Sequence, residues 1–273
     1  MESLIINGGK SLAGDVTVSA AKNACLPILF GCLLNQEKIN LKSLPDLRDI
    51  KTSIRLLEEI GAEISGDLNS LYIDCAKVDK TCAPYELVKT MRASVLVLGP
   101  LLGRFGEAQV SLPGGCAIGG RPVDIHLSNL EKMGAIIKLE NGYIQAKASK
   151  LKGAVLDLSF PSVGATENLL MAAVYAEGET IINNAAKEPE ITDLANFLIS
   201  MGAIVEGHGT STIKVTGVRE LRGCEYQPIG DRIEAATFLL TGLLANQKIT
   251  VKGFSTEHLS SVFSILKEIQ LKK

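Results

Sequence analysis

Three copies of one pattern organise this chain. The dipeptide Gly-Ala begins at Gly61, Gly134 and Gly202, about 70 residues apart, and each time it follows apolar residues at helical spacing. Each copy begins with a more apolar stretch that leads into a short strand. Each copy therefore predicts a helix, a strand, a second helix, the Gly-Ala turn and closing strands near 70–74, 143–148 and 212–215. Chance similarity of helix and strand segments is the alternative, but the shared element order weighs against it.

A fourth copy begins at Ile233 with the apolar stretch IEAATFLL and continues into the strand-like ITVKGF. Gln270 stands where its Gly-Ala turn would come, and the sequence ends at Lys273. A helix needs the strands that it covers to complete a layer. We therefore expect three complete units, part of a fourth, and a chain truncated at its C-terminus.

The segment 113–126, PGGCAIGGRPVDIH, combines four glycines with one thiol and one guanidinium. Glycine lets a ligand approach the backbone closely. Cys116 has polar, flexible neighbours, and Arg121 is a source of positive potential that favours thiolate. The planar fork of Arg121 also suits phosphate or carboxylate. The loop predicts a reactive thiol beside an anion site. For the other thiols, namely Cys25, Cys32, Cys75, Cys82 and Cys224, we expect inert, buried positions.

Composition excludes several classes of protein. The formal net charge is -2, aromatic residues make up 4% and tryptophan is absent, which argues against a nucleic-acid or membrane-surface protein. The N-terminus lacks the pattern of a secretory signal, and the weakly polar run 93–103 is shorter than the roughly 20 residues needed to span a bilayer. Six cysteines without CxxC and three histidines without HExxH predict no metal site. We expect a soluble, cytoplasmic protein without a cofactor.

Six motifs together resemble the family of UDP-N-acetylglucosamine enolpyruvyl transferases, also called UDP-N-acetylglucosamine 1-carboxyvinyltransferases. They are SAAKNACLPIL at 19–29, KTMRAS at 89–94, SLPGGCAIGGRPVDIH at 111–126, FPSVGATEN at 160–168, AAKEPEI at 185–191 and DRIEAATF at 231–238. The resemblance implies an α/β fold of the enolpyruvyl-transferase type, an inside-out α/β domain built from βαβαββ repeats. It also implies a division into a strand segment of the second domain (1–20), the N-terminal domain (21–230) and an incomplete start of the C-terminal domain (231–273).

The resemblance implies transfer of the enolpyruvyl group of phosphoenolpyruvate to the 3-hydroxyl of UDP-N-acetylglucosamine, with release of phosphate, as the first committed step of peptidoglycan synthesis. Cys116 matches the thiol that donates a proton to the substrate methylene, can add to phosphoenolpyruvate and is alkylated by fosfomycin. The residues matched to catalysis or to phosphoenolpyruvate are Lys22, Asn23, Arg92 and Arg121. Fixed cations there would hold the phosphate and carboxylate. The residues matched to UDP-N-acetylglucosamine are Asn23, Arg92, Arg121, Pro122, Val123, Asp124, Ile125, Ser162, Val163 and Gly164.

The resemblance also bears on several other positions. We expect His126 to be a hydrogen-bonded structural residue, and Glu188, Glu190, Asp231 and Arg232 to lie near the interdomain region. Because the family's catalytic carboxylate and its closing arginines belong to the second domain, we expect this chain alone to be inactive. The alternatives are a 5-enolpyruvylshikimate-3-phosphate synthase, which Lys22-Asn23 and the PGGC loop argue against, a non-catalytic UDP-sugar-binding remnant, and a damaged gene product.

Overall fold

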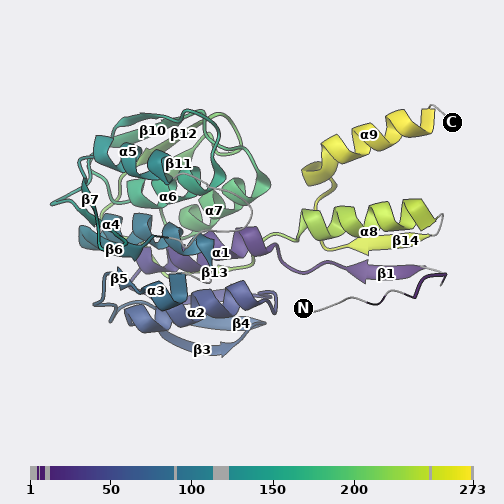
Figure 1. Cartoon of the computed structure of the whole chain (residues 1–273), viewed down its shortest axis with the longest axis horizontal. Coiled ribbons are helices and arrows are strands. Elements are labelled where there is room, and N and C mark those ends of the chain that lie inside the picture. The colour runs from purple at the N-terminus through teal and green to yellow at the C-terminus, as the bar shows by residue number, and fades with distance from the viewer. Residues whose placement is uncertain are drawn as a thin grey trace. The chain divides into compact units, whose positions relative to one another are not determined.

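The computed structural model describes residues 5, 7–9, 13–88, 91–112, 123–245 and 248–271 of the chain. For residues 92 and 269–271 it describes the backbone only. The chain divides into two compact units (Figure 1). The larger unit is Ala21–Ile229, and the smaller unit joins the described residues of 1–20 to those of 230–273. Among the described helices, none is long and apolar enough to cross a membrane.

In the part of the larger unit that the structure describes, three four-stranded sheets share one topology. The strands, in spatial order, are β13 (Glu225–Tyr226), β2 (Ile39–Lys42), β4 (Ser70–Asp74) and β3 (Glu63–Asp67) in the first sheet; β5 (Cys82–Ala83), β6 (Glu107–Ser111), β8 (Tyr143–Lys147) and β7 (Ile136–Glu140) in the second; and β9 (Val155–Asp157), β10 (Glu179–Asn183), β12 (Thr212–Thr216) and β11 (Ile204–Glu206) in the third. In each sheet the first pair is parallel and the other pairs are antiparallel.

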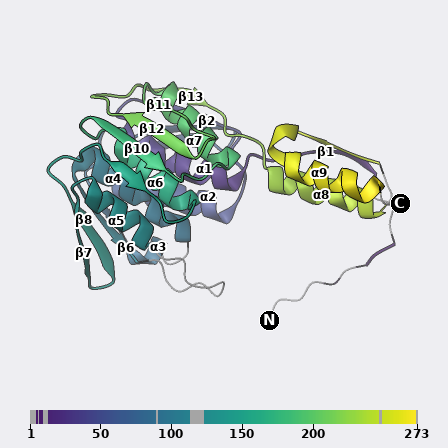
Figure 2. The same ribbon diagram turned by 90° about the horizontal axis from the view of Figure 1, so that it is seen from above.

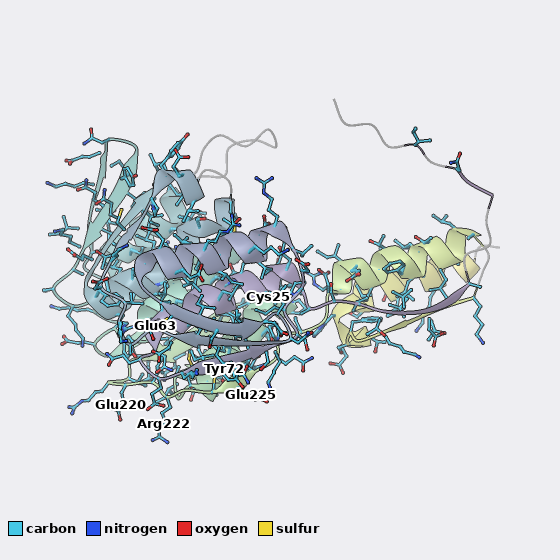
Figure 3. The ribbon with its side chains drawn as sticks, turned by 90° about the horizontal axis from the view of Figure 1, so that it is seen from below. Cys25, Glu63, Tyr72, Glu220, Arg222 and Glu225 are labelled. Atoms are coloured by element: carbon cyan, nitrogen blue, oxygen red, sulfur yellow. The ribbon has the colours of Figure 1, made fainter. Side chains whose placement is uncertain are left out.

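The first sheet is completed by the last strand of the unit, β13. Glu225 of β13 and Tyr72 of β4 are both labelled on this sheet in Figure 3. The Glu225 carboxylate accepts a hydrogen bond from Asn40 Nδ2 at 3.0 Å and lies 3.1 Å from Lys42 Nζ. The first and last strands of the unit therefore pair in one sheet, although 185 positions separate Asn40 from Glu225.

Helices of two kinds fill the unit. The central helices are α1 (Lys22–Gly31), which continues into η1 (Cys32–Leu34), then η2 (Arg92–Val97) with α4 (Leu98–Phe105), and α6 (Val163–Ala173). Residues 24–31 of α1 and 165–173 of α6 are all buried, as expected of a helix that is apolar all round. The covering helices α2 (Arg48–Ile60), α5 (Asp124–Lys132) and α7 (Pro189–Ser200) also have exposed residues, and α3 (Tyr85–Val88) is one short turn.

The sheets turn one face toward these helices. Alternate residues are buried in the same strand of each repeat: Leu71 and Ile73 in β4, Ile144 and Ala146 in β8, Ile213 and Val215 in β12. In Figure 1 the helices α1, α6 and α7 lie between β3–β4 and β10–β12. This arrangement, with helices inside and sheets outside, confirms the predicted repeat architecture.

The three Gly-Ala turns are one structural device. Gly61, Gly134 and Gly202 have φ of 111°, 94° and 104°, values that glycine adopts without strain. The following alanine N–H donates to the carbonyl five residues back, in the Schellman pattern that ends helices. These bonds are Ala62 to Leu57 (2.9 Å), Ala135 to Leu130 (3.1 Å) and Ala203 to Leu198 (3.0 Å). Glycine thus ends each covering helix, and a buried alanine starts the return to the sheet.

The smaller unit contains β1 (Gly14–Thr17), which pairs in parallel with β14 (Ile249–Lys252), together with α8 (Arg232–Ala245), η3 (Thr256–Leu259) and α9 (Ser260–Leu271). Asp231 Oδ1 accepts from the N–H groups of Ile233 (2.8 Å) and Glu234 (3.0 Å), so it caps α8. The carboxylate of Glu234 accepts from the N–H and hydroxyl of Ser19. The helix, strand and second helix expected of the fourth copy are present, and Gln270 lies within α9.

Candidate functional site

Lys22 and Asn23 stand where central helix α1 reaches the surface. Asn23 is exposed and Lys22 is half-buried, whereas the helix from Ala24 onward is buried. Among the residues that the structure describes, no side chain caps the helix at Ala21, and the first-turn N–H groups of a helix have no partner within it. The Lys22 Nζ lies 3.1 Å from Oδ2 of Asp49 on α2. The start of α1 therefore combines a cation, an amide and backbone donors, a set suited to an anion.

The central helix beside α1 begins with another predicted site residue. Arg92 is the first residue of η2, after Met91 in extended conformation, and η2 packs against α1. The side chain of Arg92 and the whole of Cys116, Arg121 and Pro122 lie outside the described residues. Their assignments therefore stay predictions.

A cavity of about 380 Å³ lies beside α2. It is lined by Asp46, Arg48, Lys51, Thr52 and Arg55 of the α2 region and by Glu86 and Leu87 of α3. Lys51 pairs with Asp46 at 2.5 Å between Nζ and Oδ1. The cavity lining thus mixes three cations of α2 with the carboxylates of Asp46 and Glu86.

Six of the predicted nucleotide-binding residues lie at the starts of two helices, α5 and α6. Val123 is the N-cap residue of α5, followed by exposed Asp124 and buried Ile125. Ser162 is the N-cap residue of α6, and its hydroxyl accepts from Ala165 N at 3.3 Å. Val163 and Gly164 are half-buried in the first turn of α6. Each segment offers backbone N–H groups at a helix N-terminus, where a negatively charged ligand is favoured.

His126 joins these two helix starts. Its Nδ1 lies 3.0 Å from Nδ2 of Asn168 on α6. A Cβ atom added to Gly164 would lie 3.5 Å from Cε1 of His126, so the imidazole packs against the first turn of α6. In Figure 2 α5 lies beside α6, with which it is in contact. The structure therefore brings the segments 123–125 and 162–164 together.

Burial keeps the His126 imidazole neutral at neutral pH, because it lowers the pKa to about 4. The expectation that His126 is a hydrogen-bonded residue is confirmed. Its partner Asn168 was missed by sequence reasoning, although this asparagine ends the quoted motif FPSVGATEN.

A second link joins α6 to the segment before α7. The Thr166 hydroxyl donates to Ser162 O at 2.8 Å and accepts from Ala186 N at 3.1 Å. The motif AAKEPEI therefore packs against the motif FPSVGATEN. Beside them, burial raises the pKa of Glu167 well above its ordinary range, and the nearby carboxylates of Glu190 and Glu188 raise it further.

The four charged residues expected near the interdomain region are divided between the units. Glu188 and Glu190 belong to the larger unit, and Asp231 and Arg232 to the smaller unit. Their proximity to the interdomain region stays a prediction.

The expectation of buried thiols is confirmed for three of the five described cysteines. Cys25, Cys32 and Cys75 are buried, and Cys82 and Cys224 are half-buried. Burial raises the pKa of Cys75 to about 12 and also raises the pKa of Cys32, Cys82 and Cys224. Thiols of this kind react slowly, because the thiolate is the nucleophile.

Comparison with known proteins gives three kinds of match. The family model described as EPSP synthase (3-phosphoshikimate 1-carboxyvinyltransferase) matches residues 6–272. A UDP-N-acetylglucosamine 1-carboxyvinyltransferase of Geotalea uraniireducens is 53% identical over 96% of this chain and 63% of its own length. An enzyme of the same name from Nitratidesulfovibrio vulgaris is 55% identical over 96% of this chain and 63% of its own length. The chain thus spans about 63% of the length of these curated relatives.

Solved structures share the fold. The enolpyruvyl transferase NikO from Streptomyces tendae aligns with a TM-score of 0.84 at 23% identity, over 96% of this chain and 63% of that one. An EPSP synthase from Acinetobacter baumannii aligns with a TM-score of 0.75 at 21% identity, over 97% of this chain and 61% of that one. These likenesses confirm the predicted fold class.

Proposed function

The chain belongs to the EPSP synthase family, and on this premise we propose that it serves the transfer of the enolpyruvyl group from phosphoenolpyruvate to the 3-hydroxyl of UDP-N-acetylglucosamine. The observation that carries the proposal is the 53% identity, over 96% of the chain, to a relative named for that reaction. The aligned EPSP synthase structure is only 21% identical. The difference favours a UDP-sugar over a shikimate phosphate as the acceptor.

We assign the anionic donor substrate to the start of α1. The reaction protonates the methylene carbon of phosphoenolpyruvate, while the sugar 3-hydroxyl gives up its proton and its oxygen bonds to the neighbouring carbon. Loss of a proton from the methyl group and cleavage of the carbon–oxygen bond to phosphate then give the product and inorganic phosphate. Lys22, with Arg92 and Arg121, would hold the phosphate and carboxylate groups throughout. Asn23 would contact the reacting sugar hydroxyl, and Cys116 would deliver the proton to the methylene carbon.

We assign the UDP-sugar to the paired helix starts of α5 and α6. Support comes from their adjacency, from Asp124 at the exposed end of α5 and from the backbone N–H groups of both first turns. Recognition through the backbone explains why apolar residues such as Val123, Ile125 and Val163 occupy predicted nucleotide-binding positions. Arg121 and Pro122 would extend this surface. In the cell we place the reaction in the cytoplasm, at the first committed step of peptidoglycan synthesis, with fosfomycin as an inhibitor that alkylates Cys116.

Calorimetry on the 273-residue chain tests the proposal. UDP-N-acetylglucosamine should bind, and shikimate 3-phosphate should give no heat of binding at the same concentrations. The reverse preference would overturn the choice of acceptor. A phosphate-release assay with phosphoenolpyruvate and UDP-N-acetylglucosamine tests turnover separately. We expect no release from this chain alone, and release that Cys116→Ser abolishes would contradict that expectation.

A further inference from the structure

The side chain of Asn168 is completely buried and its amide is fully hydrogen-bonded. Its Oδ1 accepts from the N–H of Gly99 at 2.5 Å, and its Nδ2 lies 3.1 Å from the carbonyl oxygen of Val95 and 3.0 Å from Nδ1 of His126. Gly99 belongs to α4, Val95 to η2 and His126 to α5. One side chain on α6 therefore connects three other helical segments.

These partners determine the proton positions. A backbone N–H can only donate, so Oδ1 must face Gly99; a carbonyl can only accept, so Nδ2 must face Val95. The second hydrogen of Nδ2 therefore points to His126, whose Nδ1 must carry the lone pair. His126 is then the neutral tautomer with its proton on Nε2. Its low pKa of about 4 agrees with this state.

Glycine at position 99 allows α4 to approach α6 closely at Asn168. A Cβ atom on Gly99 would lie 2.3 Å from the carbonyl oxygen of Asn168 and 2.4 Å from its Oδ1. Any larger residue there would push α4 away from α6. The close approach of the two central helices and the bond to Asn168 thus depend on the same glycine.

The hydrogen bonds of Asn168 reach the proposed substrate-binding segments. His126 directly follows Ile125 in the first turn of α5, and its ring packs against Gly164 in the first turn of α6. Val95 lies three residues after Arg92 in η2. Asn168 and His126 need not touch a ligand themselves. Removing one of their hydrogen bonds would still change the spacing of the backbone groups that we propose to contact the ligand.

We infer that Asn168 and His126 are positioning residues for the UDP-sugar: their hydrogen bond sets the distance between the starts of α5 and α6, so that both sets of backbone N–H groups reach one nucleoside diphosphate. The inference rests on the proposed function. A preorganised spacing matters because a misplaced donor weakens binding even when every donor is still present.

His126→Leu and His126→Gln separate positioning from general stability. Leucine fills the space but leaves Nδ2 of Asn168 with an unsatisfied hydrogen, whereas the glutamine oxygen can accept that bond. We expect His126→Leu to bind UDP-N-acetylglucosamine about tenfold more weakly in calorimetry, and His126→Gln to recover most of the affinity. The matched control is Thr180→Val, because Thr180 is buried in β10 and its hydroxyl has no hydrogen-bond partner among the described residues. This variant should bind as the parent does.

Parental affinity in a folded His126→Leu protein would overturn the inference. Should that variant fail to fold, His126→Phe carries the same expectation, because its ring fills the space of the imidazole and offers no lone pair to Nδ2 of Asn168. If the parent itself binds no UDP-sugar, the proposed function fails. Amide NMR shifts of the free protein then test whether His126 couples the start of α5 to the start of α6. His126→Leu should then move the resonances of 123–127 and of 163–166 together, and unchanged shifts in α6 would refute the coupling.

Discussion

The Lys22 ammonium lies 3.1 Å from the Asp49 carboxylate, so the cation proposed to hold phosphoenolpyruvate already has an anionic partner on the neighbouring helix α2. Both side chains are more than one-third accessible to solvent (40% and 34%). An ion pair so exposed contributes only ~0.2–1 kcal/mol. Asp49 therefore orients Lys22 but also competes with an incoming anion.

Neutralising Asp49 should strengthen anion binding. We expect Asp49→Asn to bind phosphoenolpyruvate up to about fivefold more tightly than the parent, because that factor corresponds to ~1 kcal/mol of released pairing. Calorimetry measures the change. Asp46→Asn is the matched control, since it removes the same charge from the partner of Lys51. An equal gain in both variants would trace the effect to net charge and not to Lys22.

Cys116 should be the first thiol to react with an electrophile. Burial raises the pKa of Cys32, Cys75, Cys82 and Cys224, so little thiolate forms at those positions near neutral pH. Brief labelling with limiting iodoacetamide, followed by peptide mass spectrometry, ranks the six thiols. Comparable labelling of Cys116 and buried Cys75 in folded protein would remove the case for an activated thiol.

His126 should make stability fall in mild acid. Its pKa is about 4 in the fold against an ordinary 6.5, so between these values the unfolded chain takes up a proton that the folded chain refuses. The stabilisation is fully present above pH 6.5 and is lost as the pH falls to about 4, by about 3 kcal/mol. Urea unfolding across this range should show a steeper loss for the parent than for His126→Gln. Parallel curves would contradict the assignment.

Glu167 should act in the opposite direction. Burial raises its pKa, and so do Glu190 and Glu188. The folded chain therefore keeps a proton that the unfolded chain releases above the ordinary value of 4.5. Its contribution is present below that value and is lost as the pH rises toward the folded pKa. Glu167→Gln should thus lose less stability than the parent as the pH rises above about 4.5 in urea titrations. Exposed Glu131→Gln should follow the parent, and a Glu167→Gln protein that also follows it would refute the prediction.

Arg104 should be required for the stability of the larger unit. Its guanidinium donates to the carbonyl oxygens of Leu33 (2.7 Å), Asn35 (3.1 Å) and Cys75 (2.9 Å), which follow α1 and β4. Arg104→Met leaves these acceptors unsatisfied, at a cost of about 2 kcal/mol in the free energy of unfolding. Chemical denaturation of this variant beside exposed Arg222→Met measures the difference. Equal stability of the two proteins would show that water replaces the guanidinium.

Local sequence chemistry predicts much of the fold and the position of the candidate site. The glycines at 61, 134 and 202 predict where three helices end, because only a residue without Cβ adopts their positive φ readily. The spacing of apolar residues also distinguishes the buried helices α1 and α6, which are apolar all round, from α2, which is apolar on one face. Motif resemblance also indicates 123–125 and 162–164 as two parts of one surface, although nothing in their sequence separation requires them to meet.

Only tertiary structure decided how those parts are held. The hydrogen bond between His126 and Asn168, the pairing of Lys22 with Asp49 and the closure of the first sheet by β13 all join residues far apart in the chain. A sequence states which residues can donate, accept or carry charge, and repeating turns and apolar spacing are short-range properties that it displays directly. Which donor meets which acceptor depends on how helices pack, because a displacement of one ångström makes or breaks a hydrogen bond.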